Sequence, residues 1–338
     1  MSPRRLCAIS VDLDEIRHYF AIHGLPAPAG AAASAVYDRA LARFDELAAA
    51  ERVALTYFVV GSDLDRAVNV ERLRRSAARG HELGNHTFDH YYDLSRRSPA
   101  EMEQQIERAN VAIAAAIGAR PTGFRAPGYV VNDAVYAALE RVGMAYSSSV
   151  FPCPYYYGAK AALILAKRLV GRRSSSIVSS PGVLAAPLAP YRVGEPYYRA
   201  GSGLLELPIQ VTPRLRLPFF GTALTGLGPP LARRLARSLV GLELVNLELH
   251  GIDLLDVDDG LGALAPHQPD VRLPLERKWA TFVAVIAELR AAGYAFVRLD
   301  EAARALAAEL PAARENGAAR LNGGAAPARS SDRLRSPG

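Results

Sequence analysis

The sequence predicts an α/β fold, a (β/α) barrel, from two observations. Short apolar segments alternate with segments of helical spacing, a pattern typical of parallel strands covered by helices. Carboxylates, imidazoles and a guanidinium follow the ends of several of these apolar segments. In a (β/α) barrel the carboxyl ends of the strands meet at one mouth, where catalytic residues gather. We therefore expect a functional site at that mouth.

Each element has its own local signal. Strands are predicted where β-branched and aromatic residues form short runs, and helices where apolar residues recur every three or four positions. In chain order, these signals predict a strand at 6–14, a helix at 36–53, a strand at 53–61, a helix at 69–80, a short strand at 81–86, a helix at 98–118, a strand and turn at 121–129, a helix at 132–142, a strand at 241–251, a helix at 273–293 and a strand at 294–302. Ser98 and Pro99 mark a helix start, and Gly118 marks the end of the same helix.

The alternation breaks over about 155–235, which we interpret as an insertion at the barrel mouth within one domain of residues 1–310. Two segments in or next to it, KAALILAKRLVGRR (160–173) and PPLARRLARSLVG (229–241), combine an apolar face with basic residues. Such helices can lie on an anionic membrane surface. Alternatively, they pack on the barrel and expose their arginines, as most surface helices do. Residues 311–338, rich in Gly, Ser, Pro and Ala, predict a disordered basic tail.

Composition indicates the compartment and excludes some partners. The N-terminal segment has no apolar stretch typical of a signal peptide, and no run is long enough for a spanning helix. The two cysteines fit a reducing compartment. We expect a cytoplasmic protein, with peripheral contact at the inner membrane as the alternative. The net charge of +6 comes with no nucleic-acid-binding motif, so no nucleic acid is expected. No signal indicates an oligomeric state.

The segment HTFDH brings two histidines, His86 and His90, within four residues. A catalytic metal is typically held by three protein ligands, and Asp14 can complete such a set if both imidazoles lie on one side of a helical turn. Zinc is the expected ion, with cobalt, manganese or nickel as alternatives. Asp12, on the same strand face as Asp14, is then available as a general base. The ordinary alternative is that both histidines are polar loop residues.

Four motifs, SVDLDE, HTFDH, RAPGY and LELH, occur in an order and spacing that resemble the polysaccharide deacetylase family, the NodB-homology proteins of carbohydrate esterase family 4. The resemblance is strong over residues 5–155 and looser over 204–300. It implies a distorted seven-stranded barrel. It also implies a metal-dependent hydrolase that removes an N-acyl group, most often N-acetyl, from an amino sugar or glycan.

The resemblance also implies roles for individual residues. Asp14, His86 and His90 match the metal ligands, and Asp12 matches the general base that activates the attacking water. Arg125 matches the residue that orients Asp12, His250 matches the general acid, and the backbone near Gly128 would stabilise the oxyanion.

Two departures from the family pattern concern these roles. Leu13 separates Asp12 from Asp14, whereas the commonest family motif has adjacent aspartates. Ser147 stands where many members have an aspartate, one that would hold the acid histidine. Asp253 is a candidate substitute for that aspartate.

Two alternative functions remain open beside deacetylation. One is a catalytically inactive barrel that only binds a glycan or a metal, but such a protein has no use for a base, its orienting arginine and an acid. The other is a deformylase or deacylase of a lipid-linked amino sugar at the inner membrane, because a relative in the same superfamily removes formyl from lipid-linked aminoarabinose.

Overall fold

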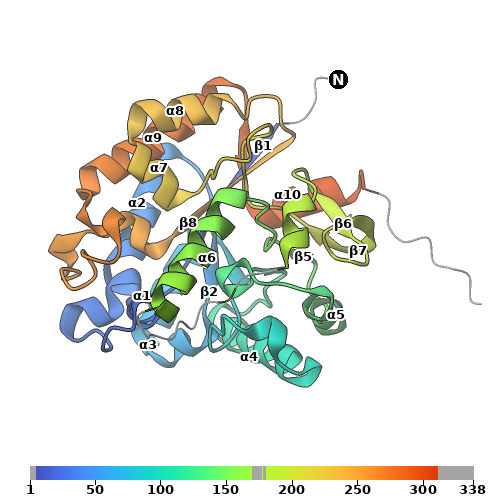
Figure 1. Ribbon diagram of the computed structural model, residues 1–338, viewed down its shortest axis with the longest axis horizontal. Coiled ribbons are helices and arrows are strands. Elements are labelled where there is room, and N and C mark those ends of the chain that lie inside the picture. Colours follow the sequence, from blue (N-terminus) through green and yellow to red (C-terminus); the bar gives the residue numbers. More distant parts are fainter. Residues whose placement is uncertain (1–4, 170–176, 178–179, 311–338) are drawn as a thin grey trace, which may run out of the picture.

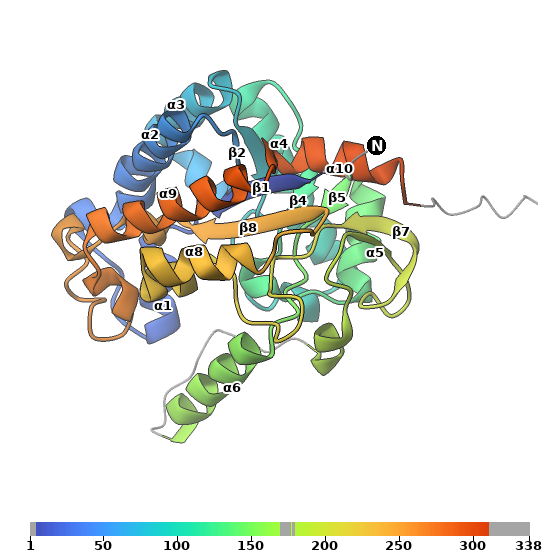
Figure 2. The same cartoon turned by 90° about the horizontal axis from the view of Figure 1, so that it is seen from above.

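The computed structural model describes residues 5–169, 177 and 180–310 and shows a curled sheet wrapped by helices (Figures 1 and 2). Its strands are β1 (Leu6–Asp12), β2 (Leu55–Val59), β3 (Glu82–Asn85), β4 (Gly123–Phe124), β5 (Tyr146–Ser147), β6 (Tyr191–Val193), β7 (Ala200–Glu206), β8 (Leu244–His250) and β9 (Ala295–Val297). Its α-helices are α1 (Ile16–His23), α2 (Leu41–Glu51), α3 (Ala67–Ala78), α4 (Pro99–Ile117), α5 (Asp133–Val142), α6 (Pro154–Leu169), α7 (Gly221–Leu227), α8 (Pro229–Arg237), α9 (Leu275–Ala291) and α10 (Leu299–Ala307). The predicted α/β barrel class is confirmed.

The strands pair in the order β6-β7-β5-β4-β3-β2-β1-β8. Seven of them, from β7 to β8, run parallel, while β6 is antiparallel to β7. β1 pairs with β8 along its whole length. Its other edge is shared, because Leu6–Ala8 pair with β9 and Ile9–Asp12 pair with β2. The carboxyl ends of the seven parallel strands therefore meet at one mouth.

The two end strands of this series, β7 and β8, are joined by residues beyond β7 rather than by a ladder. The N–H of Gln210 donates to the carbonyl of Asn246 on β8 at 3.0 Å. The side-chain amide of Asn246 donates to the carbonyls of Leu207 and Pro208 at 2.9 and 3.1 Å. Phe220 and Glu248 form a parallel bridge nearer the mouth. A buried asparagine thus closes the barrel where strand pairing stops.

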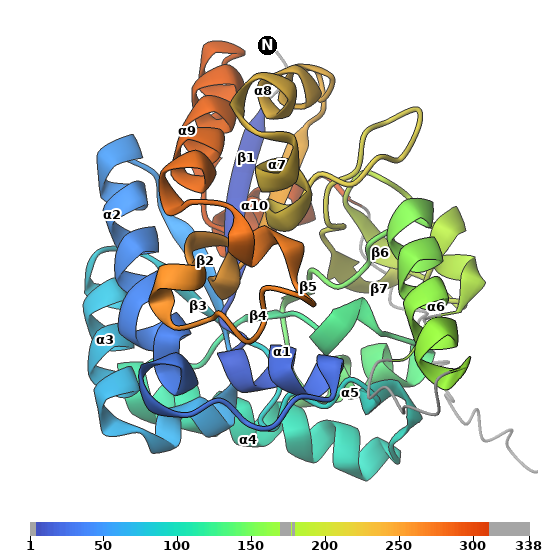
Figure 3. The same ribbon diagram turned by 60° about the vertical axis from the view of Figure 1, so that its left-hand side comes forward.

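Helices cover the outside of the sheet, as Figure 3 shows for α2, α3, α4 and α9. β1 and β2 are buried along their full length, which explains their nearly continuous apolar sequence. Among the helices, α4 has the predicted start, a capping box between Ser98 and Glu101, and the predicted left-handed end at Gly118. The last predicted strand is shorter than expected, because the carboxylate of Glu301 accepts a hydrogen bond from the N–H of Arg298 and starts α10.

The segment predicted as an insertion, about 155–235, contains elements of two kinds. α6 and β6 depart from the alternation of strands and helices, and α6 projects from the body of the barrel (Figure 2). β7, in contrast, pairs with β5 as a barrel strand, and α7 and α8 pack against α9. The first part of β7 is small and exposed, so its sequence lacks a strand signal. The predicted tail, 311–338, and residues 170–173 lie outside the described residues.

Within the ranges that the structure describes, no helix is both long and apolar enough to cross a bilayer.

Candidate active site

Three buried side chains converge at the mouth. Asp14 lies two residues beyond β1, His86 directly follows β3, and His90 lies in the next turn. The Nε2 atoms of His86 and His90 are each 3.1 Å from Oδ1 of Asp14. One candidate ligand atom from each residue can be chosen so that all three lie within 4.8 Å of one another. The structure therefore brings the predicted triad together.

The turn that carries the two histidines is not the helical turn expected from their spacing. Thr87 and His90 have positive φ angles of 64° and 56°. Oδ1 of Asn85 accepts a hydrogen bond from the N–H of Thr87 at 2.7 Å, and Oγ1 of Thr87 accepts one from the N–H of His90 at 3.1 Å. These side-chain bonds take the place of helical backbone bonds. The imidazoles still face each other, with ring centroids 4.9 Å apart.

The triad fits a divalent cation. Oδ1 of Asp14 and the Nε2 atoms of both histidines are buried without a hydrogen-bond partner, although buried polar atoms are normally satisfied. Nδ1 of His86 donates to the carbonyl of Arg125 at 2.8 Å, which leaves the lone pair of Nε2 directed at Asp14. Burial alone would raise the pKa of Asp14, but His90 and His86 lower it well below its ordinary value. An ionised carboxylate and two imidazoles are suitable ligands for zinc.

Asp12 and Arg125 form a buried ion pair beside the triad. Nη1 of Arg125 lies 2.8 Å from Oδ1 of Asp12, and both side chains are almost fully buried. The guanidinium also donates to the carbonyl and to Oγ of Ser148, each at 2.7 Å, and it lies over the ring of Phe58. These contacts fix its plane. Oδ2 of Asp12 is directed at the triad, 3.9 Å from Nε2 of His86.

His250, at the end of β8, has a partner that the sequence analysis did not single out. Its Nδ1 lies 3.0 Å from Oε1 of Glu248, which is fully buried. Its Nε2 lies 3.3 Å from the hydroxyl of Tyr129. Burial opposes the charged imidazole, but Glu248 outweighs it, and Asp12, Asp14 and Asp253 act in the same direction, so the pKa of His250 rises to about 9. Burial likewise raises the pKa of Glu248, to about 7.

The substitute suggested for the missing aspartate, Asp253, is therefore not the partner of the imidazole. Its carboxylate accepts a hydrogen bond from the backbone N–H of His250 at 2.8 Å. Ser147 bonds to Ser149 in the strand end behind the site. The signal for Glu248 was present in LELH, because residues two apart on a strand lie on the same face.

Other side chains form the walls of the site. His18 lies on α1, and its ring centroid is 4.2 Å from that of His90. The ring of Tyr92 meets that of His90 edge-on, with ring centroids 4.8 Å apart. Nζ of Lys160, on α6, donates to the carbonyl of Gly128 at 3.1 Å. Burial lowers the pKa of Lys160 to about 8. The helix that projects from the barrel is thus connected to the mouth.

Comparison with known proteins finds relatives for part of this chain. The family model for polysaccharide deacetylase matches residues 34–147, a range that includes His86, His90 and Arg125. A chitooligosaccharide deacetylase of Bradyrhizobium sp. (strain ANU 289) is 40% identical over 95 residues, 28% of this chain and 42% of that protein. A chitooligosaccharide deacetylase of Sinorhizobium fredii (strain NBRC 101917 / NGR234) is 36% identical over 102 residues, 30% of this chain and 46% of that protein. The chain spans less than half the length of these two curated relatives.

The likeness extends further in three dimensions. The crystal structure of a candidate polysaccharide deacetylase from Mycobacterium smegmatis superposes with a TM-score of 0.56 at 18% identity, covering 92% of this chain and 94% of that one. At this identity the superposition shows a shared fold. The sequence matches confirm the resemblance of residues 34–147 to the polysaccharide deacetylase family, and the superposition confirms the barrel fold.

Proposed function

We propose that this protein is a metal-dependent hydrolase that removes an N-acyl group, in the first place N-acetyl, from an amino sugar or glycan. The proposal rests on the 3.9 Å distance between Oδ2 of Asp12 and Nε2 of His86. At this distance Oδ2 of Asp12, which can take a proton, lies beside the three candidate ligand atoms. A barrel that only bound a metal or a glycan would need neither this oxygen nor the imidazole of His250, so we favour an enzyme.

The geometry supports a division of labour at the acyl carbon. A divalent cation held by Asp14, His86 and His90, zinc by preference, would polarise the acyl carbonyl when bound. Oδ2 of Asp12 takes a proton from the attacking water, while Oδ1 stays bound to Arg125. The N–H of Gly128 is our candidate donor to the oxyanion, because the N–H of Tyr129 is already bonded to the carbonyl of Ala126.

His250 completes the reaction as the acid. Its Nδ1 is held by Glu248, so Nε2 is the nitrogen that donates a proton to the departing amine. A pKa of about 9 keeps the imidazole protonated at neutral pH. Nearby Tyr129 restricts the rotation of the ring from the other side. An amine is a poor leaving group, and a charged imidazole supplies the proton that it needs.

A second candidate function, deacylation or deformylation of a lipid-linked amino sugar at the inner membrane, is favoured by one observation. Leu163 and Leu165 on α6 are 46% and 58% exposed, a few residues after Lys160, which contacts the mouth. Such leucines suit a lipid or membrane surface. Peripheral membrane contact through 160–173 and 229–241, and a cytoplasmic location, remain predictions that cell fractionation can test.

The substrate is tested by incubating the protein, loaded with zinc, cobalt, manganese or nickel in turn, with a panel of amino sugars. The panel pairs N-acetyl and N-formyl forms of free, nucleotide-bound and lipid-linked sugars, and the released acid is measured. We expect release from an N-acetyl sugar that depends on the metal. Release only from lipid-linked N-formyl sugars would favour the second candidate, and no release with any metal would favour an inactive barrel.

The contact between Glu248 and His250 predicts how kcat/KM depends on pH. Glu248→Gln removes the charge that contributes most to the raised pKa of His250, so that pKa should fall by roughly 1–3 units. The acid form of His250 is then lost at lower pH, and the alkaline limb of the kcat/KM profile should move toward neutrality by the same amount. Steady-state kinetics from pH 6 to roughly pH 10 measures the shift.

Asp253→Asn serves as the matched comparison, because Asp253 contacts the backbone of His250 rather than its ring. Its alkaline limb should move less than that of Glu248→Gln. A larger shift for Asp253→Asn, or an unmoved limb for Glu248→Gln, would show that Glu248 does not set the charge of the acid.

A further inference from the structure

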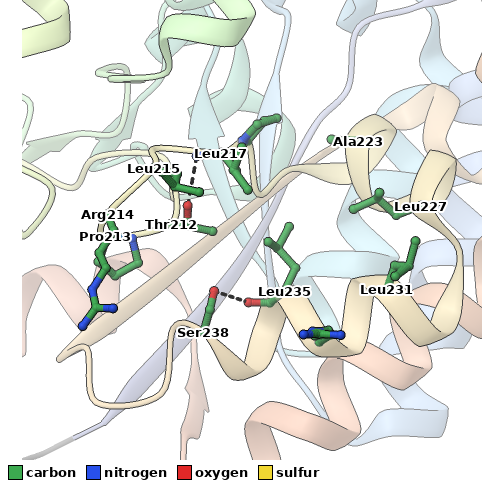
Figure 4. A pocket seen from close by; sticks show the side chains of 12 residues that line it. Thr212, Pro213, Arg214, Leu215, Leu217, Ala223, Leu227, Leu231, Leu235 and Ser238 are labelled. Carbon is green, nitrogen blue, oxygen red and sulfur yellow. Dashed lines mark hydrogen bonds between the residues drawn. The ribbon is translucent and has the colours of Figure 1, made fainter.

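A cavity of about 930 Å³ lies away from the candidate ligands, between the loop 212–218 and the helices α7 and α8 (Figure 4). Its volume is near the upper end of the range of about 300–1,000 Å³ for sites that bind small molecules. The lining is mostly aliphatic, and Leu217, Leu227, Leu231 and Leu235 face it. None of the side chains that line it is shared with the proposed catalytic machinery.

The leucines of this cavity are unusually exposed for aliphatic side chains. Leu215, Leu231 and Leu227 expose 64%, 54% and 40% of their surface. Exposed leucines scattered singly are ordinary, but a group around one cavity indicates an interaction site. The other face of α8 is occupied, because Ala232 and Ala236 are buried where the helix packs against α9. Leu231 is therefore left on the face that meets the cavity.

Two arginines line the same cavity, Arg214 and Arg234. Both are exposed, and no side chain within the described ranges forms an ion pair with either. Their neighbours Arg233 and Arg237 differ, since they lie 4.0 and 2.7 Å from the carboxylate of Glu288. The cavity lining contains no carboxylate. An aliphatic cavity with two uncompensated cations is complementary to a molecule with a hydrocarbon chain and an anionic head.

We propose that this cavity binds one hydrocarbon chain of an anionic phospholipid at a bilayer surface, with the lipid phosphate paired to Arg214 and Arg234. Exposed leucines enter the acyl boundary of a bilayer, and arginines bind phosphate in bidentate fashion. Each basic residue near an anionic bilayer surface also contributes to the free energy of binding. The proposal deepens the membrane contact proposed above for 229–241, which contains α8, but it is independent of the proposed hydrolase chemistry, because the two sites share no residue.

The test is sedimentation of the full chain with vesicles of phosphatidylglycerol and phosphatidylcholine, compared with vesicles of phosphatidylcholine alone, at low salt. The unaltered chain should bind only the anionic vesicles. Arg214→Gln with Arg234→Gln should weaken binding roughly 30-fold, at about fivefold for each arginine. The matched control is Arg199→Gln with Arg272→Gln, which removes the same net charge from exposed arginines outside the cavity. The control should weaken binding less than about twofold.

A second pair of variants tests the apolar part of the cavity. Leu227→Ser with Leu231→Ser should reduce vesicle binding, whereas Val111→Ser with Val257→Ser, at exposed positions elsewhere, should not. All altered side chains are exposed, so thermal melting should stay unchanged. Hydrolysis of a water-soluble N-acetyl sugar should also be unaffected in the cavity variants.

Three results would overturn the proposal. Equal losses in the arginine variants and their control would mean attraction by net charge alone. Absence of binding to anionic vesicles would exclude the lipid. A dimer of the unaltered chain that the leucine pair dissociates, measured by light scattering, would mean that a second copy of the chain covers the cavity.

Discussion

Replacing His86 or His90 with alanine is expected to abolish metal binding and hydrolysis together. Each histidine supplies one of three candidate ligand atoms, and its Nε2 lies 3.1 Å from Oδ1 of Asp14. Loss of a residue that merely supports a ligand typically weakens metal affinity 10–100-fold, so loss of a ligand itself should cost more than about 100-fold. Elemental analysis after dialysis should fall from about one metal per chain to near zero.

The matched control is His267→Ala, an exposed histidine whose ring stacks on that of His23. This variant should keep its metal and its activity. His18→Ala is more informative, since the ring of His18 packs against His90 without belonging to the triad. If the double variant of His86 and His90 keeps a full complement of metal, the ligand assignment is wrong.

Asp12→Asn is expected to keep the metal and lose most of the turnover. The amide preserves the shape of the side chain but cannot take a proton, and general acid–base groups contribute roughly 10²–10⁴-fold. The value of kcat should fall by that factor while the metal content stays near the unaltered level. The contrast with the histidine variants separates a base from a ligand.

Asp45→Asn provides the comparison for Asp12→Asn, because it alters another buried aspartate with an arginine partner. Asp45 lies 2.7 Å from Arg79 and contacts Tyr57 and Ser76, away from the mouth. Its variant should retain kcat even if it unfolds at a lower temperature. A near-normal kcat for metal-loaded Asp12→Asn would exclude Asp12 as the base.

Much of the fold could be predicted because its central strands carry strong local signals. β1 and β2 are buried along their whole length and are largely apolar, while β8 has apolar residues at alternate positions, Val245, Leu247 and Leu249. β4 and β5 have only two residues each and leave no periodic pattern. β7 could not be predicted, because small, exposed residues fill its first half. Short strands depend on their neighbours in space, which a local pattern does not record.

The candidate site also has parts that the sequence predicts and parts that it does not. Asp12 and His250 are the last residues of β1 and β8, and Asp14 lies two residues beyond β1, so their meeting at the mouth follows from the parallel topology. The orientation of His90 depends instead on a turn held by Asn85 and Thr87, which the spacing of the histidines does not reveal. The family pattern likewise pointed to position 147, Ser147 here, for the partner of His250. That partner is Glu248, which lies on the same strand as His250. That Glu248, and not a residue at position 147, contacts the imidazole is visible only in three dimensions.

Arg125 takes part in both halves of the proposed chemistry, which has a mechanical consequence. Its carbonyl holds the ring of His86, and its guanidinium holds the carboxylate of Asp12. A candidate ligand and the proposed base are therefore attached to a single residue at the end of β4. Any displacement of Arg125 would therefore act on His86 and on Asp12 together. The spacing on which the proposed proton transfer depends is thus set by the backbone carbonyl and the side chain of one residue.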